Sequence, residues 1–273
     1  MNTVQLDRSG GISIKYRDEG SGRPIIFLHG AFGDHRMWKK QFESSLTEDY
    51  RLIGVDLRGH GGTDGGDESS YSVDIYVDDL YEFIQEMEFE KKPVLCGLSL
   101  GGMIVQKFAE KYPEKVAGIV TASSITSETL TTSGRVQFGF ARVASTIARI
   151  VGAERAASVW MIVSKRIHGE PDVDDEVEKM GDEFLENQPE ELPPVLESTT
   201  VNRGTTDYSA INTPVLILYG EDEPSIVEEH ADYMMQRLDD AEVSVLSEAG
   251  HISPWDNPEE FNSQLRQFIS RLE

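Results

Sequence analysis

The sequence predicts an α/β protein built on a doubly wound, mostly parallel sheet with an inserted helical cap. Short apolar runs alternate with helical patterns over most of the chain. A strand pattern, a glycine-flanked serine and a helix pattern follow one another around Ser99, whereas residues 125–208 contain no convincing strand. Continuous apolar runs are typical of strands buried on both faces, as in parallel sheets, and repeated strand–helix units imply right-handed crossovers.

The first predicted element is an antiparallel hairpin over residues 3–16. Apolar and polar side chains alternate over residues 11–16, and Ser9-Gly10-Gly11 supplies the turn. The parallel strands are expected at residues 25–28, 52–55, 94–96, 118–121, 215–219 and 243–246. The intervening helices are expected to begin near Trp38, Ser72 and Gly101.

The helical insertion divides the predicted core into residues 1–124 and 209–273, with the cap at residues 125–208. One predicted cap helix has an apolar face made of Phe140, Val143, Ala144, Ile147 and Val151, with Arg142 and Arg149 opposite. A second helix is predicted over residues 156–167. Between Glu170 and Glu191 there are eleven acidic residues and one lysine.

The charge of the chain limits its partners. The 273 residues include 49 acidic and 25 basic ones, which gives a formal net charge of −24. Nucleic acids and anionic membrane surfaces require basic patches, so we expect neither as a partner. The acids are spread along the whole chain and resemble the bias of halophilic archaeal proteins, whose surfaces face a salt-rich cytoplasm. An ordinarily acidic mesophilic enzyme is the alternative.

Targeting signals and disulfides are not expected. No apolar stretch reaches the length of a membrane span, and the first seven residues lack the basic start and apolar centre of a secretory signal. We therefore expect a cytoplasmic protein. Cys96 is the single cysteine, so it forms no internal disulfide. Because it ends a predicted strand and no catalytic-thiol pattern accompanies it, we interpret it as a small buried residue.

The segment Gly97-Leu98-Ser99-Leu100-Gly101 follows a predicted strand and opens a predicted helix. This order describes a nucleophile elbow, a tight turn that pushes the serine hydroxyl out of the backbone. The turn is so close that the positions two before and two after Ser99 need little or no side chain, which explains Gly97 and Gly101. A serine hydroxyl is a poor nucleophile until a base takes its proton, so a base and an orienting acid are expected elsewhere.

The base is expected after the last predicted strand and before the last helix. Of the six histidines, His251 stands at that place. The acid is expected just after the strand at residues 215–219, because serine, acid and histidine follow one another in this order in one known triad arrangement. Three consecutive acids, Glu221-Asp222-Glu223, stand there between Gly220 and Pro224. The residues alone therefore leave the choice of acid open.

Two backbone N–H groups are candidate donors to a developing oxyanion. The first belongs to Leu100, the residue after the predicted nucleophile. The second is expected in the turn after the first parallel strand, where Ala31 is preferred and Phe32 is the alternative. His29 in the same turn is interpreted as a structural hydrogen-bonding residue.

A metal site is not expected. Asp56 and His60 lie near a strand end, but no further ligand set accompanies them, so we interpret them as a structural loop near the pocket. Three arginines repeat every seven residues and so share one helix face, interpreted as solvated, with carboxylate binding as the alternative: Arg135, Arg142 and Arg149. Three histidines are interpreted as surface or helix residues: His35, His168 and His230.

Together these motifs resemble the α/β-hydrolase superfamily from about residue 10 to the C-terminus. The matching segments are His29-Gly30, Asp56-Leu57-Arg58-Gly59-His60-Gly61, Gly97-Leu98-Ser99-Leu100-Gly101-Gly102, Tyr219-Gly220-Glu221-Asp222-Glu223-Pro224, and Gly250-His251 with Pro258-Glu259. The superfamily places its acid three residues after the glycine, often as Asp-Pro. This register favours Glu223, whereas residue type favours Asp222, one position earlier. The superfamily also inserts a helical cap where residues 125–208 lie.

The resemblance implies a cofactor-free serine hydrolase that cleaves an ester, thioester or lactone of a small, largely apolar molecule through an acyl-enzyme. The elbow and His251-Ile252-Ser253 look like the 3-oxoadipate enol-lactonases. Trp255 after His251 is similar to the meta-cleavage-product C–C hydrolases. The candidate residues of the substrate pocket are Phe32 and Trp255.

Two rival functions remain open at the level of sequence. The first keeps the same triad but cleaves a C–C bond or forms a peracid. The second is a non-catalytic, hydrolase-like binding protein, against which the intact Ser99 and His251 argue. We expect a small-molecule substrate, no cofactor, no nucleic-acid or membrane partner, and a monomer or small homo-oligomer.

Overall fold

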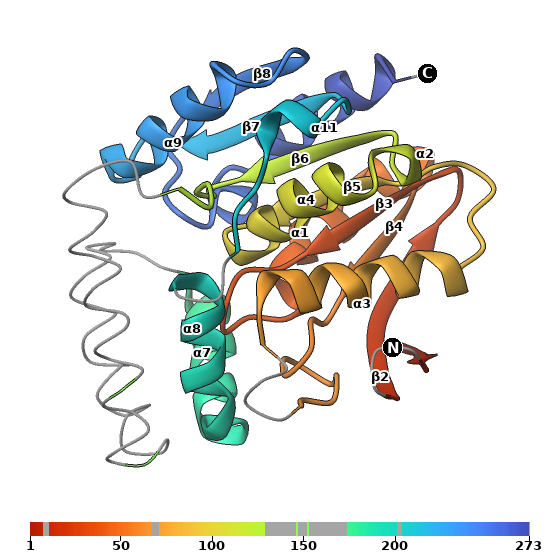
Figure 1. The fold of residues 1–273 in the computed structure, drawn as a ribbon, viewed down its shortest axis with the longest axis vertical. Helices are drawn as coiled ribbons and strands as arrows, with labels where there is room; N and C mark the ends of the chain where they lie inside the picture. Colours follow the sequence, from red (N-terminus) through yellow and green to blue (C-terminus); the bar gives the residue numbers. More distant parts are fainter. Residues whose placement is uncertain are drawn as a thin grey trace.

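In the computed structural model, the chain folds into an eight-stranded sheet with helices on both faces (Figure 1). The structure describes residues 1–7, 11–66, 71–128, 146, 152, 174–200 and 204–272. The helices predicted around residues 140–151 and 156–167 lie almost entirely outside these residues, as do Arg135, Arg142, Arg149 and His168. The predicted cap boundaries, residues 125 and 208, therefore stay a prediction.

The strands are β1 (Asn2–Leu6), β2 (Ile12–Gly20), β3 (Arg23–Leu28), β4 (Tyr50–Val55), β5 (Val94–Leu98), β6 (Gly118–Ala122), β7 (Val215–Gly220) and β8 (Ala241–Leu246). Their spatial order is β1-β2-β4-β3-β5-β6-β7-β8. β1 and β2 form the predicted antiparallel hairpin, and β2 also runs antiparallel to β4. All neighbours from β4 to β8 are parallel, so the predicted mostly parallel sheet is confirmed.

Both faces of the sheet are buried, and β3 shows why its sequence is continuously apolar. Ile26 and Leu28 belong to one core cluster, whereas Ile25 and Phe27 belong to the other, and all four are fully buried. Successive side chains of a strand point to opposite faces, so a strand between two helical layers needs apolar residues at every position.

Two helical layers cover the sheet. One core cluster includes buried residues of α3 (Val73–Glu86), α4 (Leu100–Lys111) and α9 (Ser225–Met235). The other includes residues of η1 (His35–Trp38), α1 (Lys39–Phe42), α2 (Leu46–Asp49), α10 (Ser253–Asp256) and α11 (Pro258–Ser270). Two short turns, η3 (Pro113–Lys115) and η5 (Tyr208–Ala210), connect elements. The Ser72 hydroxyl caps α3 by accepting a hydrogen bond from the Ile75 N–H at 3.2 Å, as expected for a helix start.

The strand order reverses at β3, near the centre of the sheet. The chain passes from β3 to β4 on one side, and then returns to β5 on the other side of β3. At such a reversal the connections at the carboxyl ends of the two central strands diverge, and ligands of open α/β sheets bind in the crevice between them. The turn after β3 and the turn after β5 therefore flank the position where a ligand is expected to bind.

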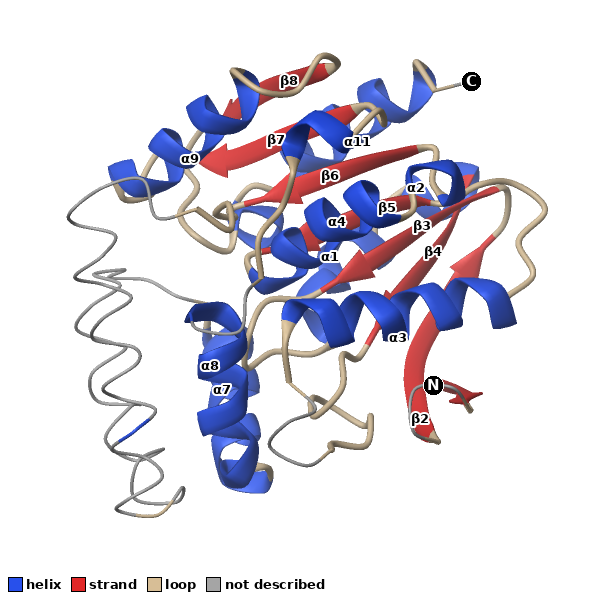
Figure 2. Ribbon diagram, in the orientation of Figure 1, coloured by secondary structure: helices blue, strands red, loops and turns tan. Residues whose placement is uncertain are grey.

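Helices α7 (Asp175–Asn187) and α8 (Leu192–Thr200), joined by η4 (Pro189–Glu191), lie on the side toward which the parallel strands point (Figures 1 and 2). Val177 and Met180 of α7 belong to one core cluster, and Phe184 and Leu185 belong to the other. α7 thus contributes to both clusters. Residues 175–200, the longest described stretch of the predicted cap, form α7, η4 and α8.

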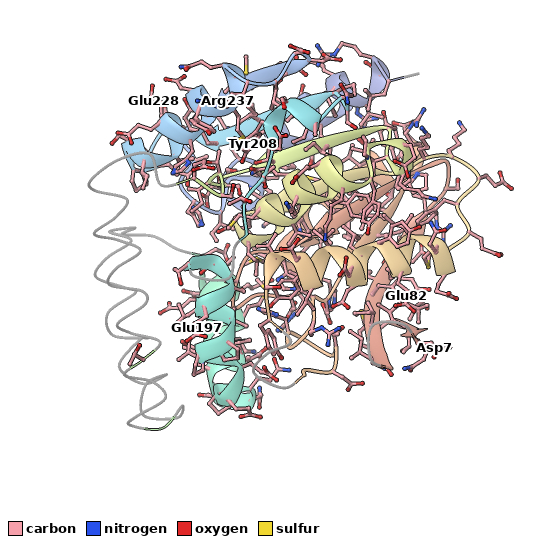
Figure 3. All side chains as sticks on the ribbon, viewed as in Figure 1. Asp7, Glu82, Glu197, Tyr208, Glu228 and Arg237 are labelled. Atoms are coloured by element: carbon pink, nitrogen blue, oxygen red, sulfur yellow. The ribbon has the colours of Figure 1, made fainter. Side chains whose placement is uncertain are left out.

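Acidic side chains are spread over the fold. Figure 3 labels Asp7 near the N-terminus, Glu197 on α8 and Glu228 on α9. Within the described residues, no helix has both the length and the apolar character needed to cross a membrane. Cys96 is fully buried on β5, and burial raises the pKa of its thiol well above the ordinary value, so the thiol stays protonated and inert, as predicted.

Candidate active site

Ser99 is the single residue between β5 and α4. Its backbone has φ 51° and ψ −109°, a combination outside the main allowed regions that costs on the order of 1–3 kcal/mol. A Cβ atom added at Gly97 would lie 2.1 Å from the Gly101 carbonyl oxygen, and one added at Gly101 would lie 2.3 Å from the Leu28 carbonyl oxygen. Both clashes are with backbone atoms, which gives the two glycines of the predicted elbow a steric reason.

Backbone contacts hold Ser99 in this strained conformation. Its N–H donates to the Ala122 carbonyl at 2.9 Å, and its carbonyl accepts a hydrogen bond from the Ser124 hydroxyl at 2.8 Å. A strained backbone conformation persists where the surrounding structure holds both the N–H and the carbonyl of the residue. Ser99 itself is half-buried.

His251 and Glu223 lie in the turns that follow β8 and β7. The Nδ1 atom of His251 is 2.7 Å from Oε1 of Glu223. The Glu223 side chain is 1% exposed and the His251 side chain is 33% exposed. A Cβ added at Gly220 would lie 2.0 Å from the Ala249 carbonyl oxygen, so the two turns are in direct contact. That contact brings the acid and the imidazole together.

The two candidate acids have different surroundings. Asp222 is exposed, and its backbone N–H donates to the Ala249 carbonyl at 3.0 Å. Glu223 follows it in a tight turn, with its N–H donating to the Gly220 carbonyl at 3.2 Å. Only the Glu223 carboxylate reaches His251 in the contacts of the described residues. The geometry therefore agrees with the register of the motif and not with the alternative based on residue type.

The predicted oxyanion donors lie on the two central turns. Leu100 is the first residue of α4, where a backbone N–H has no partner within the helix. Ala31 lies in a turn closed by a hydrogen bond from the Gly33 N–H to the Gly30 carbonyl at 3.3 Å. A Cβ added at Gly30 would lie 3.4 Å from the Ser99 Cβ, so this turn borders the elbow. Phe32 has φ 66°, which turns the backbone sharply after Ala31.

Two buried histidines support these turns in neutral form. His29 donates from Nδ1 to the Gly30 carbonyl at 2.7 Å and accepts at Nε2 from the Leu57 N–H at 3.0 Å, which fixes its tautomer. His60 donates from Nδ1 to the Arg58 carbonyl at 2.9 Å. Burial lowers the pKa of His29 and lowers the pKa of His60 to about 3. Both are structural residues, as interpreted from the sequence.

The carboxylate of Asp56 meets His35 rather than His60. Oδ1 of Asp56 accepts hydrogen bonds from the N–H and Nδ1 of His35 at 2.8 and 2.7 Å, and Oδ2 accepts from the Gly62 N–H. Asp34 completes a group of three possible ligands, but Arg36 binds both of its oxygens. Protein donors thus already occupy these carboxylates, which supports the structural interpretation of this loop.

Helix α7 contacts the candidate pocket at Phe32. The Phe184 ring lies 5.3 Å from the Phe32 ring and 5.2 Å from the His60 ring. Trp255, the other candidate, is 5% exposed, lies 5.0 Å from the Lys40 ammonium and shares a core cluster with Val177 of α7. Both roles in substrate binding stay predictions.

Sequence reasoning missed several residues around the site. His230 lies on helix α9, which confirms one of its two interpretations, but it is 1% exposed, so the other interpretation, a surface position, is wrong. Its Nδ1 accepts hydrogen bonds from the N–H and hydroxyl of Thr126 just after β6. The helical spacing of Val227, His230 and Met234 carried this signal, because residues three and four apart share a helix face. Ser123, Ser124 and Ser253 were missed as well.

The chain matches a protein-family model and several known proteins. A model of the alpha/beta hydrolase family matches residues 25–264. A 3-oxoadipate enol-lactonase of Acinetobacter baylyi is 24% identical and aligns over 96% of this chain and 94% of its own length. A putative 2-succinyl-6-hydroxy-2,4-cyclohexadiene-1-carboxylate synthase of Bacillus subtilis is 35% identical, over 45% of each chain.

The fold has counterparts among solved structures. A thermophilic esterase from Thermogutta terrifontis superposes with a TM-score of 0.80 at 23% identity, covering 100% of this chain and 99% of that one. At this identity the similarity establishes the fold alone. The family match extends over most of the sequence, from the start of β3 into α11. The chain belongs to the alpha/beta hydrolase family.

Proposed function

We propose that this protein is a cofactor-free serine hydrolase that cleaves an ester, thioester or lactone of a small, largely apolar molecule. The observation that carries the proposal is the 2.7 Å contact between His251 Nδ1 and Glu223 Oε1. It lies on the edge of the sheet where Ser99 occupies a strained elbow. Nucleophile, base and orienting acid thus come from three turns at the carboxyl ends of β5, β8 and β7.

The tautomer of His251 follows from its contact with Glu223. Glu223 accepts a hydrogen bond from Nδ1–H, so Nε2 carries the lone pair that accepts the Ser99 hydroxyl proton. When Ser99 attacks the substrate carbonyl, the proton moves to Nε2 and the imidazole becomes a cation. The Glu223 carboxylate stabilises that cation and holds the ring in its orientation.

The developing negative charge falls on the former carbonyl oxygen of the substrate. The N–H groups of Leu100 and Ala31 are the proposed donors to it, because they lie on the turns that flank Ser99. His251 then gives its proton to the leaving alcohol or thiol, and an acyl-enzyme on Ser99 remains. Water, deprotonated by His251, attacks the acyl carbon, and the carboxylic acid leaves as Ser99 regains its proton.

The preference for an apolar substrate rests on the aromatic rings beside the elbow. Phe32 lies in the proposed oxyanion turn and packs on Phe184 of α7. We assign residues 125–208 as a cap whose α7 and α8 close one side of the pocket. The similarity to an enol-lactonase supports an ester or lactone substrate, since a lactone is a cyclic ester.

A series of p-nitrophenyl acyl esters of graded chain length tests this proposal. The wild type is expected to hydrolyse short and medium acyl chains, and Ser99→Ala is expected to remain folded without turnover. The circular dichroism spectrum of each protein serves as the folding control. Equal turnover by wild type and Ser99→Ala, or no turnover of any ester, would rule the proposal out.

A further inference from the structure

Two adjacent serines, Ser123 and Ser124, follow β6 and lie beside the proposed catalytic residues. They are 1% and 5% exposed. Polar side chains buried to this degree need hydrogen-bond partners, and each hydroxyl has at least one. Ser124 contacts the elbow and Ser123 contacts the segment after His251. Both are side-chain contacts, separate from the backbone hydrogen bonds of the sheet.

Ser124 contacts the elbow. Its hydroxyl donates to the Ser99 carbonyl at 2.8 Å, while the neighbouring Ala122 carbonyl accepts from the Ser99 N–H at 2.9 Å. A Cβ added at Gly102 would lie 2.4 Å from the Ser124 Cβ, so the segment after β6 packs directly on the first turn of α4. Both backbone groups of Ser99 are therefore fixed by residues at the end of β6.

Ser123 contacts the loop that carries His251. Its hydroxyl oxygen lies 3.1 Å from the hydroxyl oxygen of Ser253, which is fully buried and begins α10 two residues after His251. The backbone N–H of Ser123 donates to the Leu218 carbonyl of β7 at 2.8 Å. Ser123 is thus anchored to the sheet while its side chain holds one end of the histidine loop.

The backbone of Ser123 gives a second reason to assign its hydroxyl a role. Its φ is 47°, in the left-handed region that glycine adopts without strain. Glycine would adopt this conformation without strain, but the chain has a serine here. The serine hydroxyl makes the contact with Ser253, which glycine would lack. A strained residue persists where the surrounding structure compensates it, and such residues cluster at functional sites.

We propose that Ser123 and Ser124 are positioning residues that set the placement of the nucleophile relative to the base. Ser124 fixes the Ser99 backbone, and Ser123 fixes the loop of His251, so one dipeptide joins the two partners of the proton transfer. The inference rests on the proposed function. A misplacement of about 1 Å between reacting groups can cost about 100-fold in rate.

The test compares Ser123→Gly and Ser124→Ala with a matched control, Thr213→Val. Thr213 is also buried, and its hydroxyl donates to the Pro113 carbonyl, but it precedes β7 at the opposite end of the sheet from the site. Ser123→Gly removes the hydroxyl but relieves the backbone strain, which offsets part of the cost of taking this partner from the buried Ser253 hydroxyl. For each protein, kcat and KM for a p-nitrophenyl ester and the Tm are measured.

We expect kcat to fall by roughly 10- to 100-fold in Ser123→Gly and Ser124→Ala, with KM little changed and the Tm of Ser123→Gly within about 4 °C of that of the wild type. Thr213→Val keeps the wild-type kcat. The double variant Ser123→Gly/Ser253→Ala is no slower than the slower single variant, because both changes remove the same contact.

Wild-type kcat in both serine variants overturns the inference, even if the Tm falls, because the role is then only structural. An equal loss of kcat in Thr213→Val overturns it as well. If the wild type hydrolyses no ester and forms no Ser99 adduct with a fluorophosphonate, the proposed function is overturned, and this inference is overturned with it.

Discussion

The turns around Ser99 and helix α7 border the same proposed site, but they differ in the interactions that hold them in place. Ser99 is fixed by backbone and hydroxyl hydrogen bonds, and Glu223 is 1% exposed beside His251. α7 buries apolar side chains such as Met180 and Phe184, and exposed ion pairs also hold it, Arg36 with Glu183 and Lys39 with Glu176, both at 2.7 Å. Salt screens exposed pairs far more than buried ones.

This difference assigns the two regions different tasks. The buried turns are preorganised for the chemical step, so changes there act on kcat. The exposed ion pairs of α7 are worth about 0–1 kcal/mol each and adjust the position of a wall of the proposed pocket, so changes to these pairs act on KM and depend on salt. The predictions below test that division, beginning with the largest expected effect.

Replacement of the base should have the largest effect. His251→Ala removes the only proton acceptor of the proposed reaction, so kcat should fall by roughly 10⁴-fold or more, as expected for a triad member. Steady-state hydrolysis of a p-nitrophenyl ester at low and high KCl measures it. The loss should be the same at both salt concentrations, and a variant that keeps more than a tenth of the activity would exclude His251 as the base.

The neighbouring acids provide a matched pair. Glu223→Gln keeps the shape but removes the charge that stabilises the imidazolium, so kcat should fall by up to about 10⁴-fold. Asp222→Asn should change kcat by less than about tenfold, because this exposed side chain acts mainly on the local turn. The ratio of the two kcat values is the measurement, and the reverse ranking would transfer the role to Asp222.

The contact between α7 and the core should respond to salt. Arg36→Gln removes the pair with Glu183 and the bidentate pair with Asp34, so KM should rise by about two- to fivefold in dilute buffer, with kcat nearly unchanged. The difference from the wild type should shrink in molar KCl. Arg17→Gln is the control, since Arg17 pairs with Glu19 within β2. A loss confined to kcat contradicts the division of tasks.

The smallest expected effect concerns the charge of the whole chain. A net charge of −24 repels itself over ~10–30 Å in dilute buffer, and molar salt shortens that range to ~3 Å. Thermal unfolding between about 0.05 and 3 M KCl should therefore show a Tm that rises by at least about 2–4 °C, the shift that 1 kcal/mol produces in a domain of this size. A flat or falling Tm would support the ordinary mesophilic reading.

The sheet and the elbow were predictable because their causes are local. Parallel strands buried on both faces leave continuous apolar runs, and the elbow needs glycines at fixed distances from Ser99. For the sheet and the elbow, a steric or periodic rule acts within a few residues of the chain. The position of His251, the proposed base, followed instead from the order of the elements along the whole chain.

The remaining features depend on contacts between distant segments. The register of the motif favoured Glu223 and residue type favoured Asp222; the packing of the turn after β7 on Ala249 brings the Glu223 carboxylate to His251. No local pattern encodes the Ser123–Ser253 hydroxyl contact, since serine is common and its partner lies 130 residues away. Asp56 meets His35 instead of His60 because η1 folds back over the end of β4. Tertiary packing decides these pairs.

A fluorophosphonate probe followed by intact mass and peptide mapping tests the central claim most directly, because it reacts with an activated serine whatever the natural substrate is. The account predicts one adduct per chain, located on Ser99, none on Ser99→Ala, and much slower labelling of Glu223→Gln than of Asp222→Asn. An adduct that persists in Ser99→Ala, or a wild type that forms none, would contradict the account.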